Sequence, residues 1–279
     1  MTDLVLITGA TGFVGRQVLR ALLKDGHRVR VVSRTGRESV LEPSEGIEKV
    51  VTTPDLFAES ADWWTKTCED VDTIVHVAWY TEPGKYLTSG KNLDCLSGTL
   101  ALAQGAIRAK VRRFVGVGTC FEYDLTVRDL SISTPLVPTS PYAAAKAAAY
   151  LSLSQILPVQ GMEFGWCRLF YLYGEGEDTR RLVPYLREQL QKGEPAKLTS
   201  GKQVRDFMDV RSAGHSIAKA AVGNIEGAIN ICSGEPISIR QLAEKIADEY
   251  DRRDLLHFGA REDNVVDPPR VVGVPTRLE

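Results

Sequence analysis

The stretch that most constrains what this chain can fold into is Thr8–Gly15, which reads TGATGFVG. The apolar run Leu4–Ile7 before it is typical of a buried strand, and apolar residues at helical spacing after it predict a helix to about Lys24. The glycines therefore lie where a strand turns into a helix. Such a turn offers free backbone N–H groups and the positive end of a helix dipole, and glycine lets phosphates approach closely. This context favours a dinucleotide site over a plain glycine-rich turn.

Composition excludes several classes of protein. The chain has 279 residues, 43% hydrophobic and 25% charged, with a formal net charge of −2. We therefore expect one large α/β domain, or one such domain and a small lobe, and neither nucleic acid nor a membrane as partner. The five cysteines and four histidines are scattered, so we expect no metal site and no disulfide framework. Because a strand begins at Leu4, we expect no signal peptide, and the scattered cysteines favour a reducing, cytoplasmic setting.

Strand and helix patterns alternate as far as residue 172. This alternation predicts a doubly wound parallel sheet with helices on both faces, and its ligand crevice is expected at the carboxyl ends of the strands. The expected strands cover residues 4–7, 29–32, 47–51, 73–78, 114–117 and 164–169, and the expected helices cover 13–24, 92–109 and 141–157.

Beyond residue 172 the regular alternation of strands and helices ends. This change predicts a smaller α/β lobe, residues 173–279, beside the domain of residues 1–172. The boundary is soft, since the chain can cross between the lobes more than once. The tail from Gly259 carries three prolines and is interpreted as irregular surface. Helices are expected at 182–192, 213–222 and 239–250, and strands at 197–199, 206–209 and 228–231.

The end of the second strand bears on the choice of nicotinamide cofactor. An acid there accepts a hydrogen bond from the 2′-hydroxyl of NAD, whereas a basic residue meets the 2′-phosphate of NADP. The chain has Ser33 and Arg34, with Arg37 nearby, and an arginine gives a phosphate a charge-assisted contact. The sequence thus favours NADP over NAD. Asp55, after the third strand, is interpreted as a contact for the adenine amino group.

Tyr142 and Lys146 stand four residues apart, on one face of an expected helix. A free tyrosine has a pKa of about 10, and a nearby ammonium lowers it, which makes Tyr142 a candidate acid or base for a carbonyl or carbinol. Thr119, at the end of the fifth strand, can hydrogen-bond the same oxygen. Cys120 is interpreted as a packing residue and Glu122 as a support of the loop.

Together these residues resemble the extended short-chain dehydrogenase/reductase family, in its NDP-sugar epimerase/dehydratase branch. The resemblance implies a Rossmann-like domain and a lobe that binds a nucleotide-sugar. The matching pieces are Thr8–Gly15, 76–78, Asn92, Thr119, Tyr142 with Lys146, 168–174, 201–207 and 228–234.

By this resemblance, Thr119, Tyr142 and Lys146 are similar to the catalytic triad of the family. Arg181 and Arg205 are similar to residues beside the substrate diphosphate, which suits the preference of a pyrophosphate for arginine. Trp79 and Tyr80, just past the fourth strand, are expected to line the sugar pocket. The expected cofactor contacts are Gly9, Thr11, Gly12, Phe13, Val14, Gly15, Ser33, Arg34, Asp55, Ala78, Tyr142, Lys146 and Phe170.

The departures from the family pattern narrow the expected activity. Dehydratases of the family carry an Asp-Glu pair directly after the catalytic threonine, where this chain has Cys120 and Phe121. The residues around Thr119 and at His76–Trp79 are most similar to 4-ketoreductases of 6-deoxyhexoses. The favoured hypothesis is an NADP-dependent reductase of an NDP-4-keto-6-deoxyhexose. The alternatives are an NDP-sugar epimerase with tightly bound NAD(P) and a non-catalytic NADP-sensing module. Apolar positions on the helices expected at 92–109 and 141–157 predict a homodimer.

Overall fold

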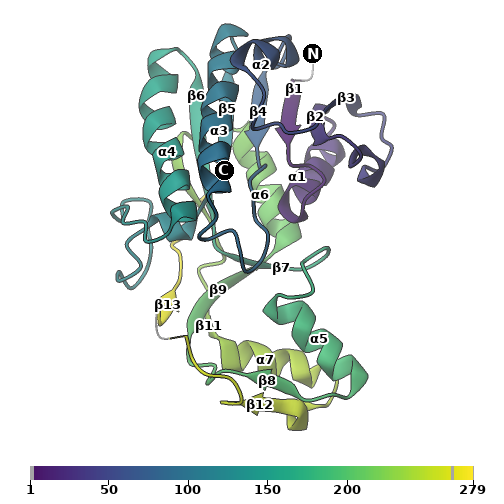
Figure 1. Ribbon diagram of the computed structural model, residues 1–279, viewed down its shortest axis with the longest axis vertical. Coiled ribbons are helices and arrows are strands. Elements are labelled where there is room, and N and C mark those ends of the chain that lie inside the picture. The colour runs from purple at the N-terminus through teal and green to yellow at the C-terminus, as the bar shows by residue number, and fades with distance from the viewer. Residues whose placement is uncertain (1–2, 265–266, 279) are drawn as a thin grey trace.

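The structure is a computed structural model that describes residues 3–264 and 267–278. Its centre is a seven-stranded sheet in the order β10-β6-β5-β4-β1-β2-β3, in which every neighbouring pair is parallel (Figure 1). The doubly wound parallel sheet predicted from the sequence is thereby confirmed. The strands are β1 (Leu4–Thr8), β2 (Arg28–Arg34), β3 (Ile47–Thr53), β4 (Thr73–His76), β5 (Arg113–Thr119), β6 (Glu163–Leu169) and β10 (Gly227–Ile231).

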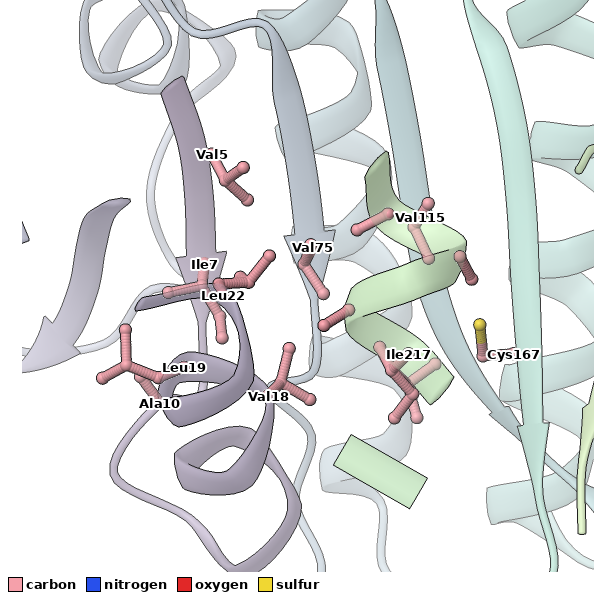
Figure 2. Close-up of a cluster of buried hydrophobic side chains, with 14 of the residues drawn as sticks. Val5, Ile7, Ala10, Val18, Leu19, Leu22, Val75, Val115, Cys167 and Ile217 are labelled. Atoms are coloured by element: carbon pink, nitrogen blue, oxygen red, sulfur yellow. The ribbon is translucent and has the colours of Figure 1, made fainter. Parts of the chain in front are cut away.

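Two layers of helices cover the sheet, because successive strand residues point to opposite faces. Val5 and Ile7 of β1 pack toward α1 and α6, whereas Leu4 and Leu6 pack toward the other three helices. Figure 2 shows Ile217 of α6 among the side chains of the first layer. The helices are α1 (Phe13–Lys24) and α6 (Val210–Val222) on one face, and α2 (Ala61–Thr67), α3 (Lys91–Arg108) and α4 (Pro141–Val159) on the other.

The remaining elements form the smaller lobe and its connection to the sheet, at the lower end of Figure 1. A separate apolar core holds α5 and α7 against a two-stranded sheet. The lobe contains α5 (Leu182–Lys192), β8 (Ala196–Leu198), α7 (Ile239–Asp248) and β12 (Leu256–Phe258), and the connection contains β7 (Tyr171–Tyr173), β9 (Val204–Asp209), β11 (Pro236–Ser238) and β13 (Arg270–Val271). Short 3-10 helices are η1 (Glu38–Val40), η2 (Cys120–Glu122) and η3 (Arg253–Leu255).

Two parts of the chain lie elsewhere than the sequence predicts. The helix and strand expected at 213–222 and 228–231 belong to the main sheet, where α6 packs on α1 and β10 pairs with β6. The tail after Gly259 is not all irregular surface, because β13 pairs with β9 and Val271 and Val272 are buried. The chain thus crosses between the lobes repeatedly, and the division at residue 172 stays a prediction.

Within residues 3–264 and 267–278, no helix is long and apolar enough to cross a membrane.

Candidate active site

A cavity of about 1580 Å³ opens at the carboxyl ends of β1, β2, β4 and β5 and extends to the smaller lobe. It exceeds the roughly 300 to 1,000 Å³ of a typical single-ligand site, so it has room for a dinucleotide and a second ligand. All the site residues that the sequence predicts line it, from both lobes: Gly9, Thr11, Gly12, Phe13, Val14, Gly15, Ser33, Arg34, Asp55, Ala78, Trp79, Tyr80, Thr119, Tyr142, Lys146, Phe170, Arg181 and Arg205.

The glycine turn between β1 and α1 fits a pyrophosphate. Gly9 has a φ of 76°, and a Cβ there would lie 2.7 Å from the amide nitrogen of Ala78. A Cβ on Gly15 would overlap the carbonyl of Gly9. Gly12 is the N-cap of α1 and supplies no side-chain acceptor, so the first N–H groups of the helix stay available to an anion.

His76 fixes this turn against the end of β4. Its imidazole is buried, with Nδ1 2.9 Å from the Thr8 hydroxyl and Nε2 2.9 Å from the Thr99 hydroxyl. Burial lowers the pKa of His76 to about 3, and the charge of Lys146 acts in the same direction. His76 is therefore neutral near pH 7, and its role is to hold Thr8, whose hydroxyl also accepts the N–H of Ala78 at 3.2 Å.

The end of β2 places basic side chains beside the cavity. Ser33 is buried, whereas Arg34 is exposed, and Arg34 and Arg37 both line the cavity. Asp55 lies across from them after β3, where its carboxylate accepts the N–H of Phe57 at 3.0 Å. This arrangement gives a ligand at the β2 edge two guanidinium groups and one carboxylate to contact.

The Thr119 hydroxyl, the Tyr142 phenol and the Lys146 ammonium lie together at the end of β5. The Ser140 hydroxyl caps α4 by accepting the N–H of Ala143 at 3.2 Å, and the helix then places Tyr142 and Lys146 one turn apart. Thr119 is the last residue of β5 and the N-cap of η2, so the turn points its side chain to the cavity.

Burial dominates the titration of the pair on α4. It raises the pKa of Tyr142 far above the usual range, and the charges of Tyr86 and Glu122 add to this, while a hydrogen bond with Thr119 opposes it. The sequence argument expected a pKa lowered by Lys146, and the structure differs because desolvation penalises the phenolate. Burial lowers the pKa of Lys146 to about 7, and the charge of Glu122 opposes that shift.

The aromatic residues after β4 are fixed by their neighbours. The Lys146 Nζ lies 3.8 Å from the centroid of the Trp79 ring, an attractive cation–π geometry, and also donates to the carbonyl of Val117. Trp79 is held there by Asn92, whose Oδ1 accepts the indole N–H at 2.9 Å. Tyr80 donates to Glu82 at 2.8 Å.

The two predicted substrate arginines come from the connection and the smaller lobe. Arg205 is buried and forms an ion pair of 2.6 Å with Asp267. Arg181 is the N-cap of α5, and its guanidinium carbon lies 5.9 Å from the centroid of the Tyr86 ring. Both face the same cavity as Tyr142.

Tyr86 is a site residue that the sequence reasoning missed. Its ring packs edge-on against the ring of Tyr142, with centroids 4.8 Å apart, and it lines the cavity. Asn92 holds the backbone of this loop by donating to the carbonyls of Tyr86 and Ser89 at 2.7 and 2.9 Å. The sequence offered one indication of this role for Tyr86, its position in the chain. A loop that follows β4 must cross the carboxyl edge of the sheet, where the cavity lies.

A glycine turn that fits a pyrophosphate and a phenol–lysine pair in the same cavity are typical of a nicotinamide-dependent oxidoreductase of Rossmann type. Comparison with known families then identifies the group. Residues 5–232 match the NAD dependent epimerase/dehydratase family, and the chain belongs to it. The expected family and the expectation of an NAD(P)-dependent enzyme are thereby confirmed.

Relatives match over most of the chain at low identity. The dTDP-6-deoxy-L-talose 4-dehydrogenase (NAD(+)) of Aggregatibacter actinomycetemcomitans is 25% identical over 256 residues, covering 88% of this chain and 90% of the relative. The CDP-abequose synthase of Salmonella muenchen is 24% identical over 295 residues, covering 98% and 91%. A solved UDP-N-acetylglucosamine 4-epimerase from Methanobrevibacter ruminantium superposes with a TM-score of 0.87 at 21% identity, covering 99% and 91%, which shows the shared fold.

The cysteine thiols are expected to be inert in the folded protein. All five are free and buried, and burial raises the pKa of Cys120 to about 12, so its thiol stays protonated near neutral pH. The native protein should therefore not react with Ellman's reagent at about pH 8, and the unfolded chain should release five equivalents. Rapid native labelling at Cys120 would contradict its interpretation as a packing residue.

Proposed function

We propose that this protein is an NADP-dependent reductase of the C4 ketone of an NDP-4-keto-6-deoxyhexose. The observation that carries the proposal is that Thr119, Tyr142 and Lys146 share one cavity with Cys120 and Phe121. The first three residues are groups that ketone reduction needs, and the last two take the place of the acidic pair of a dehydratase. Similarity to a dTDP-6-deoxy-L-talose 4-dehydrogenase and to a CDP-abequose synthase supports a nucleotide-linked deoxy sugar.

When bound, the reduced nicotinamide supplies the hydride that adds to C4 of the sugar. Tyr142 donates its phenolic proton to the oxygen of the former carbonyl, and the Thr119 hydroxyl donates a hydrogen bond to the same oxygen. The ketone thus gains a hydride and a proton and becomes an alcohol. Burial raises the pKa of Tyr142 and so keeps the phenol protonated, the form that proton donation requires.

Lys146 supports the reaction without touching the ketone. Its ammonium, held by the Val117 carbonyl and the Trp79 ring, leaves donors for the nicotinamide ribose. Its positive charge also stabilises the phenolate that Tyr142 becomes after proton transfer. Trp79 and Tyr80 are assigned to the wall of the sugar pocket.

Arg181 and Arg205 are assigned to the substrate diphosphate. Arg205 forms an ion pair with the Asp267 carboxylate, an anion that a phosphate can replace beside the guanidinium. Substrate binding then exchanges one anion for another beside a guanidinium that is already fixed in place. The conformational entropy of the Arg205 side chain is therefore lost when the protein folds and not when the substrate binds.

Arg34 and Arg37 support NADP as the cofactor. Both line the cavity at the end of β2, where the adenosine ribose lies in this fold class. A dissociable NADPH suits net reduction. The alternative function, an epimerase, predicts that the purified protein retains its cofactor through dialysis, and a non-catalytic sensor predicts NADPH binding with no ketone reduced.

Replacing Tyr142 with Phe removes the proton donor and keeps the ring. Turnover of NADPH with dTDP- or CDP-linked 4-keto-6-deoxyhexoses, measured by loss of the reduced-nicotinamide absorbance, should fall about 100- to 10,000-fold. NADPH binding, measured by its fluorescence, should be largely unchanged. The control is Tyr250→Phe, a residue that does not line the cavity. Undiminished turnover of Tyr142→Phe contradicts the mechanism.

Replacing Arg34 with Ser tests the choice of cofactor. The dissociation constant for NADPH should rise about 10- to 100-fold, because a charge-assisted contact to the 2′-phosphate is lost. Binding of NADH should change little. Arg28→Ser, at the opposite end of β2 and outside the cavity, is the matched control. Equal losses for NADPH and NADH would reject the assignment of Arg34 to the 2′-phosphate.

We also propose that two copies pair through α3 and α4. These helices lie side by side, and between them is an apolar groove lined by residues such as Leu100 and Ile156. Leu93 and Leu151 are 67% and 56% exposed on the same helices, which leaves an apolar face to cover. Light scattering after gel filtration should report a dimer, and Leu151→Glu should report a monomer. The control Val40→Glu, on η1, should stay a dimer.

A further inference from the structure

Glu122 is a fully buried carboxylate directly behind the catalytic turn. It is 0% exposed and does not line the cavity. Its Oε1 accepts the backbone N–H of Thr119 at 2.7 Å, and both of its oxygens lie 3.1 Å from the indole nitrogen of Trp166. Its Oε2 accepts the Nε of Arg168 at 2.7 Å. Every one of these partners is a donor, which is the environment of an ionised carboxylate.

Glycines on β5 make room for this carboxylate. A Cβ on Gly118 would overlap Glu122 Oε1 and the indole nitrogen of Trp166, and a Cβ on Gly116 would overlap the Trp166 ring. Both glycines point to the face that carries Trp166, two residues apart along the strand. The two glycines of β5 thus leave room for the Trp166 ring and for the Glu122 carboxylate that the indole contacts.

Arg168 is itself fixed, so the carboxylate is held from several elements. Its guanidinium carbon lies 4.6 Å from the centroid of Tyr123 and 4.3 Å from the centroid of Tyr150. The Tyr123 hydroxyl accepts from Arg168 at 3.0 Å and donates to Asn230 of β10 at 2.7 Å. Hydrogen bonds therefore connect Thr119 to β6 and β10 through Glu122.

We propose that Glu122 is a positioning residue of the reductase site, which holds the backbone of Thr119 and supplies a negative charge to the Tyr142–Lys146 pair. The inference rests on the proposed function. It goes beyond support of the loop, because it assigns Glu122 two separable tasks. The length of its side chain positions the Thr119 hydroxyl through the backbone N–H of Thr119, and its negative charge favours the protonated forms of Tyr142 and Lys146.

Trp166 links Glu122 to the groups on α4, because its indole nitrogen lies 3.1 Å from both carboxylate oxygens and the Lys146 Nζ lies 5.8 Å from the centroid of its ring. The effect of the Glu122 charge on the pKa has the same direction for both groups on α4. The negative charge of Glu122 raises the pKa of Lys146 and the pKa of Tyr142, since an anion favours the protonated form of each. Reduction needs Tyr142 protonated and Lys146 charged, so Glu122 extends activity toward higher pH. The other charged and titratable groups that face these three side chains are His76, Tyr86, Cys95, Cys120, Tyr123 and Arg168.

Glu122→Gln tests the charge, because the amide keeps an acceptor for Thr119 and loses the anion. In the pH profile of kcat/KM for reduction of dTDP-4-keto-6-deoxyglucose by NADPH, the alkaline limb should move to lower pH by about one pH unit. The matched control is Glu163→Gln, which removes a carboxylate from the buried Arg113, 2.8 Å away, at the far end of the same strands. It should lower thermal stability and leave the profile in place. A folded Glu122→Gln with the wild-type profile overturns the charge assignment.

Glu122→Asp tests whether the length of the Glu122 side chain positions Thr119, because aspartate keeps an anion for Arg168 and is one methylene shorter. It also serves if Glu122→Gln does not fold. We expect kcat to fall about 10- to 100-fold, with the alkaline limb where it is in the wild type. Wild-type kcat in Glu122→Asp overturns the positioning of Thr119.

Failure of this inference is distinguishable from failure of the proposed function. If Tyr142→Phe and Lys146→Met retain turnover, the proposed function fails and the role of Glu122 fails with it. If both lose turnover while Glu122→Gln and Glu122→Asp behave as the wild type, only the role of Glu122 is rejected.

Discussion

The whole site depends on how closely two backbone segments approach at the carboxyl edge of the sheet. The turn after β1 and the end of β4 come so near that a Cβ on Gly9 would lie 2.7 Å from the nitrogen of Ala78. A neutral His76 fastens the same junction through Thr8. The glycine turn lies on one side of this junction, and the cavity wall that carries Trp79 lies on the other. Their relative position is therefore set by backbone contact, which few substitutions at Gly9 can preserve.

Local chemistry made much of this predictable. The continuous apolar run of β1, which is buried on both faces, and the helical spacing of apolar residues in α1 depend on neighbouring residues, so the sequence shows them directly. The glycine turn, Arg34, Thr119 and the Tyr142–Lys146 spacing also each lie within one short stretch. A parallel sheet then brings the ends of its strands to one edge, which is why these separate stretches line one cavity.

Long-range partners were not predictable. Glu122 and Arg168 are 46 residues apart, and no periodicity links them. The apolar face of α6 indicated that this helix packs against another element. It did not indicate that the partner is α1, on one face of the main sheet. Val271 is buried and belongs to β13, a strand of two residues in a proline-rich tail. A strand of this length is too short to show a periodic pattern in the sequence. Tyr86 packs on Tyr142 in a loop whose path is held by Asn92 and by a backbone hydrogen bond from Tyr142 to Leu87.

The return of the chain to the main sheet has a consequence for biosynthesis. The edge strand β10 ends at Ile231, and the α6 helix that covers α1 is made just before it. During N-to-C synthesis the dinucleotide-binding half therefore emerges with one flank of its apolar core uncovered. The core can close only after α5 and β8 of the smaller lobe, which precede α6 and β10 in the chain, have also been made. The order of synthesis thus couples the folding of the main sheet to the smaller lobe before either lobe can bind a ligand.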